Sequence, residues 1–261
     1  MKLSCFCPAA LLSQAGKAGF DDVEPDICEI NAMSAAQFEA YQSEARAAGF
    51  AMEVFSDVIP LTERFHSPQF ELAFWLEHVK RGAERTALLG ARRWTFGAGK
   101  CRSIPEDCPD RAAAVRRVEE IVGAICDVLL PYGITLLVEP LGPANSNFLG
   151  TIDETAEFVR RIGRNNLSAM CDLRHMVKRE EPFTEIVRCR EWIGHAHIDN
   201  PAGTARLFPQ AGDGYEGYEE YIRALKEAGY DGILAIEATQ YGDFLSEARE
   251  SVRYLRTLLT D

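Results

Sequence analysis

The sequence predicts an α/β fold in which a single (β/α)8 TIM barrel spans residues 1–261. Three observations support this prediction: strand-like runs alternate with helical patterns eight times, most of the runs are continuously apolar, and the length suits one barrel of about 250 residues. Continuously apolar strands are typical of a parallel sheet that helices cover. Because no linker, repeat or low-complexity segment divides the chain, we expect one domain.

Each predicted strand is short and is followed by a helix. In chain order, the strands are predicted at residues 2–7, 22–27, 51–59, 93–97, 134–141, 167–173, 193–200 and 232–238. The helices are predicted at residues 8–19, 34–49, 67–89, 110–132, 151–162, 184–192, 218–229 and 244–259.

Capping residues set several of these bounds. Ser34 with Gln37, and Thr151 with Glu154, have the spacing of capping boxes, in which side chains pair with the free N–H groups of a first helical turn. Gly133 follows the long fourth helix, and glycine commonly ends helices because it adopts the left-handed conformation readily.

An open doubly wound sheet is the alternative fold. It would require a glycine-rich phosphate loop after the first strand, and residues 7–11, CPAAL, do not form one. Gly97 and Gly99 are a weak nucleotide-binding signal, since the third glycine is missing.

Composition restricts the partners. Apolar residues make up 47% and charged residues 26%, as in ordinary globular proteins, and the net charge of −12 with no basic run argues against nucleic acid. No stretch approaches the roughly 18 apolar residues of a membrane helix, and the apolar N-terminus is too short and interrupted for a signal peptide. Eight cysteines without a Cys-x-x-Cys pair are expected to be reduced thiols in a cytoplasmic protein.

Residues 193–200, IGHAHIDN, put unusual side chains on one face of a strand. By the period of two, His195, His197 and Asp199 lie on the same side. Histidines hydrogen-bonded in the core are the plainer interpretation, but the His-x-His-x-Asp spacing at a strand end favours a metal or proton-transfer site.

Three other predicted strands end in single acids, Glu139, Asp172 and Glu237. Active sites of such barrels lie at the carboxyl ends of the strands, so these acids and His197 are expected to converge. One acid alone would be explained by neighbours that satisfy it, but three carboxylates together repel one another unless a cation neutralises them. Three oxygens and one imidazole suit Mn²⁺ or Mg²⁺, with Co²⁺ or Zn²⁺ as alternatives.

These motifs resemble the xylose isomerase-like TIM barrel superfamily, in particular its sugar phosphate isomerase and epimerase branch. The resemblance is strongest from about residue 90 to 237 and rests on the order and spacing of short motifs: VEPL at 138–141, SNFLGT at 146–151, DLRH at 172–175, HAHID at 195–199 and IE at 236–237. It implies a homo-oligomer, a dimer or a tetramer.

The resemblance also implies roles for individual residues. One divalent ion would be bound by Glu139, Asp172, His197 and Glu237, of which Glu139 and Glu237 would also transfer protons. His175 and Arg206 would contact the substrate, although Arg206 follows His197 at a longer spacing than in close relatives. Asn147 in the SNFLGT motif and Arg102 in the loop after residues 93–97 are further candidates for substrate binding, with Arg102 or Arg206 anchoring the far end of the substrate.

The expected activity is isomerisation or epimerisation of a small sugar or keto-polyol, by abstraction of an α-proton and a metal-stabilised enediolate. An inosose-type dehydratase is the alternative, because it abstracts the same kind of proton. An abasic-site endonuclease would need additional histidines where residues 55–56 are Phe-Ser and 96–97 are Phe-Gly. A non-catalytic barrel is disfavoured because all four ligand positions are filled.

Overall fold

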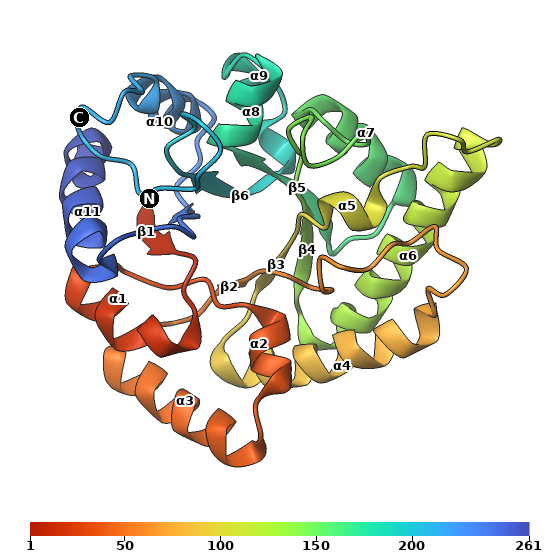
Figure 1. Ribbon diagram of the computed structural model, residues 1–261, viewed down its shortest axis with the longest axis horizontal. Helices are drawn as coiled ribbons and strands as arrows, with labels where there is room; N and C mark the ends of the chain where they lie inside the picture. The colour runs from red at the N-terminus through yellow and green to blue at the C-terminus, as the bar shows by residue number, and fades with distance from the viewer. Residues whose placement is uncertain (261) are drawn as a thin grey trace.

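Seven parallel strands form the sheet of the protein, which is described by a computed structural model for residues 1–260. The strands run in the order β1-β7-β6-β5-β4-β3-β2. Figure 1 shows the helices arranged around the outside of the strands. The strands are β1 (Lys2–Cys5), β2 (Val54–Phe55), β3 (Arg93–Phe96), β4 (Thr135–Val138), β5 (Leu167–Asp172), β6 (Ile193–Ile198) and β7 (Ile233–Ile236).

A short extended segment, residues 24–26, lies between the two edge strands β1 and β2. Isolated parallel bridges pair Phe6 with Glu24 and Asp26 with Ser56, so backbone pairing continues around the ring. The strand predicted at residues 22–27 is therefore present only as two bridges. Pro25 has no N–H group to contribute to a ladder, which explains why a regular strand does not form. The α/β barrel is confirmed, with seven regular strands among residues 1–260 and not eight.

Helices follow the strands and cover the outside of the sheet (Figure 1). They are α1 (Leu12–Ala18), α2 (Ile27–Ala32), α3 (Ala35–Ala48), α4 (Leu72–Leu89), α5 (Gly99–Arg102), α6 (Arg111–Leu129), α7 (Ile152–Ile162), α8 (Leu173–Arg179), α9 (Thr184–Arg188), α10 (Tyr218–Glu227) and α11 (Phe244–Thr260). Among residues 1–260, no helix combines the length and the apolar character that crossing a membrane requires.

The capping residues act largely as predicted. At α3, Ser34 Oγ accepts the Gln37 N–H at 3.3 Å, and Gln37 Oε1 accepts the Ser34 N–H at 2.8 Å. At α7, Thr151 Oγ1 accepts the Glu154 N–H at 3.2 Å, but the Glu154 carboxylate accepts the Gly150 N–H instead of that of Thr151. The second capping box is therefore only half formed.

Three short helices, α2, α5 and α8, were not predicted, and α4 begins later than expected. In place of its predicted start, Phe70 donates its N–H to the Ser67 carbonyl at 3.0 Å in a turn. Helix α8 matters for the site, because it begins directly after β5 and Asp172 is its N-cap. The strand end is fixed by this helix start.

Candidate active site

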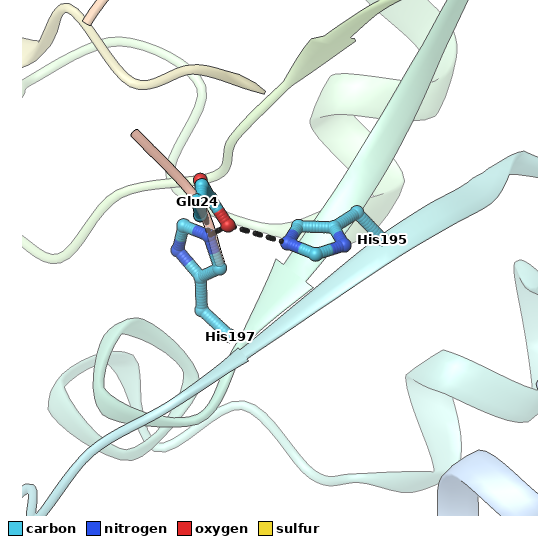
Figure 2. Close-up of side chains that lie close together, drawn as sticks. All are labelled: Glu24, His195 and His197. Carbon is cyan, nitrogen blue, oxygen red and sulfur yellow. Dashed lines mark hydrogen bonds and ion pairs between the residues drawn. The ribbon is translucent and has the colours of Figure 1, made fainter. Parts of the chain in front are cut away.

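Strand β6 places two histidines inside the barrel. His195 and His197 lie on the same face, as the period of two predicts, and both are buried. Their Nε2 atoms face the carboxylate of Glu24, which comes from the segment between β1 and β2 (Figure 2). Glu24 Oε2 lies 2.9 Å from His195 Nε2, and Glu24 Oε1 lies 3.1 Å from His197 Nε2.

The role of Glu24 was not predicted from the sequence. Thr95 on β3 also donates its hydroxyl to Glu24 Oε1 at 3.3 Å, so the carboxylate contacts three side chains. Burial alone would raise the pKa of Glu24, but the charges of His197 and His195 hold it well below its usual value. The signal that could have indicated this contact is Glu24 itself, an acid between Val23 and Pro25 in a predicted strand.

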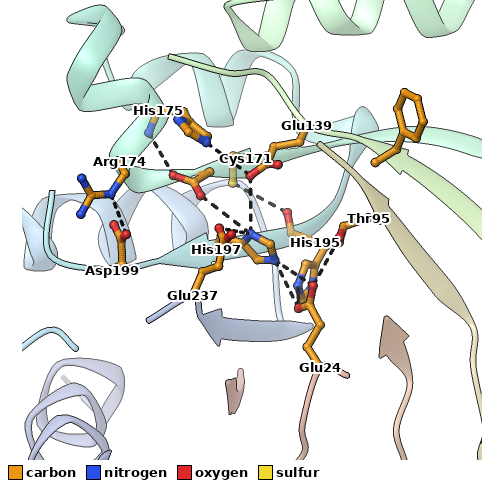
Figure 3. Close-up of polar contacts among 12 residues, drawn as sticks. Glu24, Thr95, Glu139, Cys171, Arg174, His175, His195, His197, Asp199 and Glu237 are labelled. Carbon is orange, nitrogen blue, oxygen red and sulfur yellow. Dashed lines mark hydrogen bonds and ion pairs between the residues drawn. The ribbon is translucent and has the colours of Figure 1, made fainter. Parts of the chain in front are cut away.

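The other ring nitrogen of His197 faces the acids predicted to converge on it. His197 Nδ1 lies 3.2 Å from Glu237 Oε2, 3.5 Å from Glu139 Oε1 and 3.8 Å from Asp172 Oδ2. Figure 3 shows Glu139 and Glu237 reaching His197 from different strands. The structure therefore brings all four predicted ligand side chains together, at the ends of β4, β5 and β7 and within β6.

Three of the atoms that face the centre of this cluster lack hydrogen-bond partners. Within residues 1–260, Glu139 Oε1, Asp172 Oδ2 and His197 Nδ1 are buried without a hydrogen bond, whereas Glu237 Oε2 lies 2.6 Å from Arg206 Nη1. A buried polar atom without a partner costs about 1–3 kcal/mol. Three carboxylate oxygens and one imidazole nitrogen that converge are a donor set for one divalent cation, so the residues present fit the expected ion.

The electrostatics of the cluster favour a positive charge at its centre. Burial alone would lower the pKa of His197, but Glu24, Glu139 and Glu237 raise it well above its usual value. Burial would raise the pKa of Asp172, yet His175, Arg206 and His197 hold it well below its usual range. A divalent cation would take the place of the proton on His197 Nδ1 and neutralise the same carboxylates.

Arg206 supplies a second positive charge beside the cluster. Its Nη1 lies 2.6 Å from Glu237 Oε2 and donates to Asp199 Oδ2 at 3.2 Å, and its Nη2 donates to His175 Nε2 at 3.0 Å. Asp199 is held in turn by Arg174, whose Nε donates to it at 2.6 Å (Figure 3). Asp199 therefore orients Arg206. Its position on the same strand face as His195 and His197 had predicted a direct part in the metal or proton-transfer site.

A cavity of about 560 Å³ opens onto the cluster. Glu139, His197 and Glu237 line it together with His175 and Arg206, two of the four residues predicted to bind the substrate. The other wall of the cavity is formed by residues that come after β2 and β3 in the chain, among them Asp57 and Lys100. Burial and the nearby acids Asp26 and Glu237 raise the pKa of Asp57 to about 7. The cavity offers polar groups on both walls, as a polyhydroxylated ligand requires.

Two residues predicted to bind the substrate lie elsewhere. The guanidinium of Arg102 is completely buried and donates to the backbone carbonyls of Phe96, Glu139 and Leu149. Asn147 pairs with the backbone of Ile104, accepting its N–H at 2.9 Å and donating to its carbonyl at 2.8 Å. Neither is among the described residues that line the cavity. Both positions favour a structural role in place of the predicted one.

The chain is similar in sequence to one known protein family and to two curated relatives. The family model described as xylose isomerase-like TIM barrel matches residues 12–258. The chain is 30% identical over 129 residues to a D-psicose 3-epimerase of Agrobacterium fabrum, which covers 49% of the chain and 43% of that protein. It is 23% identical over 150 residues to a fructoselysine 3-epimerase of Escherichia coli O157:H7, covering 56% and 54%. These matches thus span about half the length of each curated relative.

The solved structures extend the likeness over the whole fold. A crystal structure of D-psicose 3-epimerase in the presence of D-fructose matches with a TM-score of 0.85, at 22% identity and over 100% of both chains. A structure of AP endonuclease, family 2, from Brucella melitensis matches with a TM-score of 0.77 at 20% identity, covering 97% of this chain and 99% of the other. At these identities the likeness concerns the fold alone.

Proposed function

This chain belongs to the xylose isomerase-like TIM barrel family, and we propose that it is a divalent-metal-dependent isomerase or epimerase of a small sugar or related hydroxycarbonyl compound. The observation that carries this proposal is the set of four ligand atoms, three of them without a hydrogen bond, that converge beside a polar cavity. The names of the two curated relatives, a D-psicose and a fructoselysine 3-epimerase, support epimerisation beside the carbonyl of a ketose.

Glu139, Asp172, His197 and Glu237 would hold one ion, with Mn²⁺ or Mg²⁺ favoured by the oxygen-rich donor set and Co²⁺ or Zn²⁺ as alternatives. A bound divalent ion supplies Lewis acidity, which polarises a substrate carbonyl and makes the neighbouring C–H bond more acidic. Gly97 supports a single ion in place of the multi-metal cluster of a nuclease. A Cβ at position 97 would lie 2.6 Å from Glu139 Oε2, so no histidine fits there without displacing that carboxylate.

Glu139 and Glu237 are the two carboxylates that we assign to proton transfer. They come from β4 and β7, the outer strands of the group that carries the cluster, and both line the cavity. One carboxylate takes the proton from one face of the substrate, and the other returns a proton to the opposite face. This arrangement inverts the configuration at the carbon between them.

Arg206 and His175 are proposed to bind oxygens of the substrate. Arg206 is fixed by Asp199 and His175, so its guanidinium faces the cavity with little freedom to turn away. A preorganised arginine of this kind orients a hydroxyl or carbonyl group relative to the two proton-transfer carboxylates.

Solvent-hydrogen exchange tests the proposal directly. In heavy water with Mn²⁺ and a panel of ketoses, the protein should introduce deuterium at the carbon beside the carbonyl of at least one ketose, detected by NMR. Glu237→Gln and Glu139→Gln should each slow exchange by about 10²–10⁴-fold, the usual effect of losing a general base or acid. Glu250→Gln, on the exposed surface of α11, is the matched control and should exchange at the wild-type rate.

The metal content of each variant must be measured with the rate, because both glutamates are also ligands. If both glutamine variants keep full metal and full exchange, the two-carboxylate mechanism is wrong. Products separate the alternatives: loss of water from a keto-polyol such as an inosose would assign a dehydratase in place of an isomerase or epimerase.

A further inference from the structure

His197 lies between two groups of acids, and each of its ring nitrogens faces one of them. Nδ1 faces Glu139, Glu237 and Asp172, whereas Nε2 lies 3.1 and 3.2 Å from the two oxygens of Glu24. Glu24 contacts no other member of the proposed metal site. We propose that Glu24 is a positioning residue that fixes the tautomer and orientation of His197 so that Nδ1 presents its lone pair to the ion. This inference rests on the proposed metal site.

The proton of a neutral His197 has acceptors on both sides. Glu237 Oε2 and Glu139 Oε1 lie 3.2 and 3.5 Å from Nδ1, so they attract the proton to the nitrogen that must coordinate the metal. A proton on Nδ1 would block coordination there, since the metal ligand is the unprotonated nitrogen. Glu24 offers a closer acceptor at Nε2, and the negative charge of its carboxylate favours the tautomer with Nε2–H.

Glu24 is itself held in place from several directions. Its N–H donates to the Cys5 carbonyl at 2.8 Å, and its carbonyl accepts the Cys7 N–H at 3.0 Å. Its side chain is completely buried and contacts Thr95 and His195 as well as His197 (Figure 3). A carboxylate with fixed backbone and three side-chain contacts has little freedom to follow a rotating imidazole. It therefore restrains the ring.

Glu24, His195 and His197 also have the composition of a second metal site, but their contacts favour a hydrogen-bonded support. Both oxygens of Glu24 and both Nε2 atoms are engaged with one another, and Thr95 adds a further donor. In the other cluster, Glu139 Oε1, Asp172 Oδ2 and His197 Nδ1 have no hydrogen bond within residues 1–260, and Glu237 Oε2 is paired only with Arg206. We therefore assign one ion to the cluster around Nδ1 and none to the Glu24 cluster.

Calorimetric titration of the chelated protein with Mn²⁺ alone tests this assignment without any substrate. The wild type should bind one ion. Glu24→Gln keeps the shape of the side chain but removes its charge and one acceptor, and should weaken Mn²⁺ binding by about 10–100-fold, as loss of such a partner usually does. Asp22→Asn is the matched control, because Asp22 is equally buried in the same stretch but accepts only backbone N–H groups. It should bind Mn²⁺ as the wild type does.

A second measurement needs no variant and remains decisive if Glu24→Gln does not fold. In the Zn²⁺-loaded wild type labelled with ¹⁵N-histidine, the NMR resonances of His197 should show a protonated Nε2 and a metal-bound Nδ1. Coordination through Nε2 would overturn the inference, as would a folded Glu24→Gln protein with unchanged Mn²⁺ affinity. Two bound ions, one of them lost in Glu24→Gln, would make Glu24 a ligand and also overturn it. A wild type that binds no divalent ion would instead refute the proposed function.

Discussion

The two acid–histidine clusters of this protein share His197 and contain similar groups, yet they differ in how their atoms are paired. Around Nε2, the oxygens of Glu24 already contact His195, His197 and Thr95. Around Nδ1, the facing oxygens of Glu139 and Asp172 lack hydrogen bonds within residues 1–260, and that of Glu237 is paired only with Arg206. Proximity of acids and histidines therefore does not by itself indicate a metal site.

The pairing state also fits the surroundings of each cluster. Glu24 and His195 lie deep in the barrel and do not line the cavity as the described residues form it, whereas Glu139 and Glu237 do. A hydrogen-bonded cluster is complete without a ligand and provides rigidity. A cluster of carboxylates with unpaired oxygens that opens onto a cavity can be completed by a cation. Variants of single members should separate these two behaviours.

The largest effect is expected at Asp172, which combines two tasks in one carboxylate. Asp172 Oδ1 accepts the His175 N–H at 2.9 Å as the N-cap of α8, and Oδ2 faces the cluster. Asp172→Asn can keep the cap but loses the charge, so Mn²⁺ binding measured by calorimetry should weaken by at least about 100-fold, the upper end of the loss from a supporting residue alone.

The matched control for Asp172 is Asp26→Asn, because Asp26 caps α2 through the Cys28 and Glu29 N–H groups and lies outside both clusters' contacts. It should bind Mn²⁺ normally. If Asp172→Asn retains wild-type affinity, Asp172 is only a helix cap, and the unpaired oxygen does not mark a ligand.

A smaller effect on metal binding is expected at His195. His195→Leu removes one donor from the buried carboxylate of Glu24, which should lower the free energy of unfolding by about 1–3 kcal/mol. Mn²⁺ affinity should change by less than about tenfold, because Glu24 still contacts His197 and Thr95.

His195→Gln restores a donor and should recover part of the lost stability in urea unfolding. The opposite pattern, normal stability with loss of Mn²⁺ binding in His195→Leu, would mean that His195 is a ligand. It would also remove the distinction between the two clusters.

The strand ends could be predicted well because strand and helix patterns depend on residues that are close together in the sequence. Polar residues at the ends of four successive strands are expected to meet in a parallel barrel, so the convergence of Glu139, Asp172, His197 and Glu237 was predicted from their order in the chain. The role of Glu24 did not, because its segment pairs only through isolated bridges and its partners are about 170 residues away in the sequence.

Arg102 is a second residue whose role could not be predicted from the local sequence. Its position in the loop after residues 93–97 predicted substrate binding, but the carbonyls that it binds belong to β3, the residue after β4 and residue 149. Burial lowers the pKa of this guanidinium to about 10, so it remains charged near neutral pH. Which carbonyls need a donor depends on how loops meet in space, and no local pattern records that.

The smallest effect on metal binding is expected at Glu181, which tests whether one unpaired atom is enough to indicate a ligand. Glu181 Oε1 accepts the Ile152 N–H at 2.9 Å, while Oε2 is buried without a partner within residues 1–260. No other acid or histidine converges on it to form a third group of metal-ligating atoms among the described residues. Glu181→Gln should therefore leave Mn²⁺ affinity within about twofold of wild type, unlike Asp172→Asn, since it removes no member of a converging donor set.

In contrast to metal binding, the contribution of Glu181 to the stability of the fold should depend on pH. Burial, with Glu185 and Glu154 nearby, raises the pKa of its carboxyl to about 7. Because the folded-state pKa lies above the unfolded value of about 4.3, the contribution of Glu181 to stability is fully present at low pH and is lost as the pH rises through about 7. Glutamine carries no charge at pH 5 or at pH 8. The free energy of unfolding of Glu181→Gln, minus that of the wild type, should therefore be larger at pH 8 than at pH 5 by about 1 kcal/mol or more. Solvent near the carboxyl reduces the full effect of the pKa shift. Urea unfolding in chelator measures this difference, and Glu250→Gln on the surface should show none.

An equal difference at both pH values would mean that Glu181 is ionised in the folded protein. A loss of Mn²⁺ binding in Glu181→Gln would show that a single unpaired oxygen marks a ligand after all.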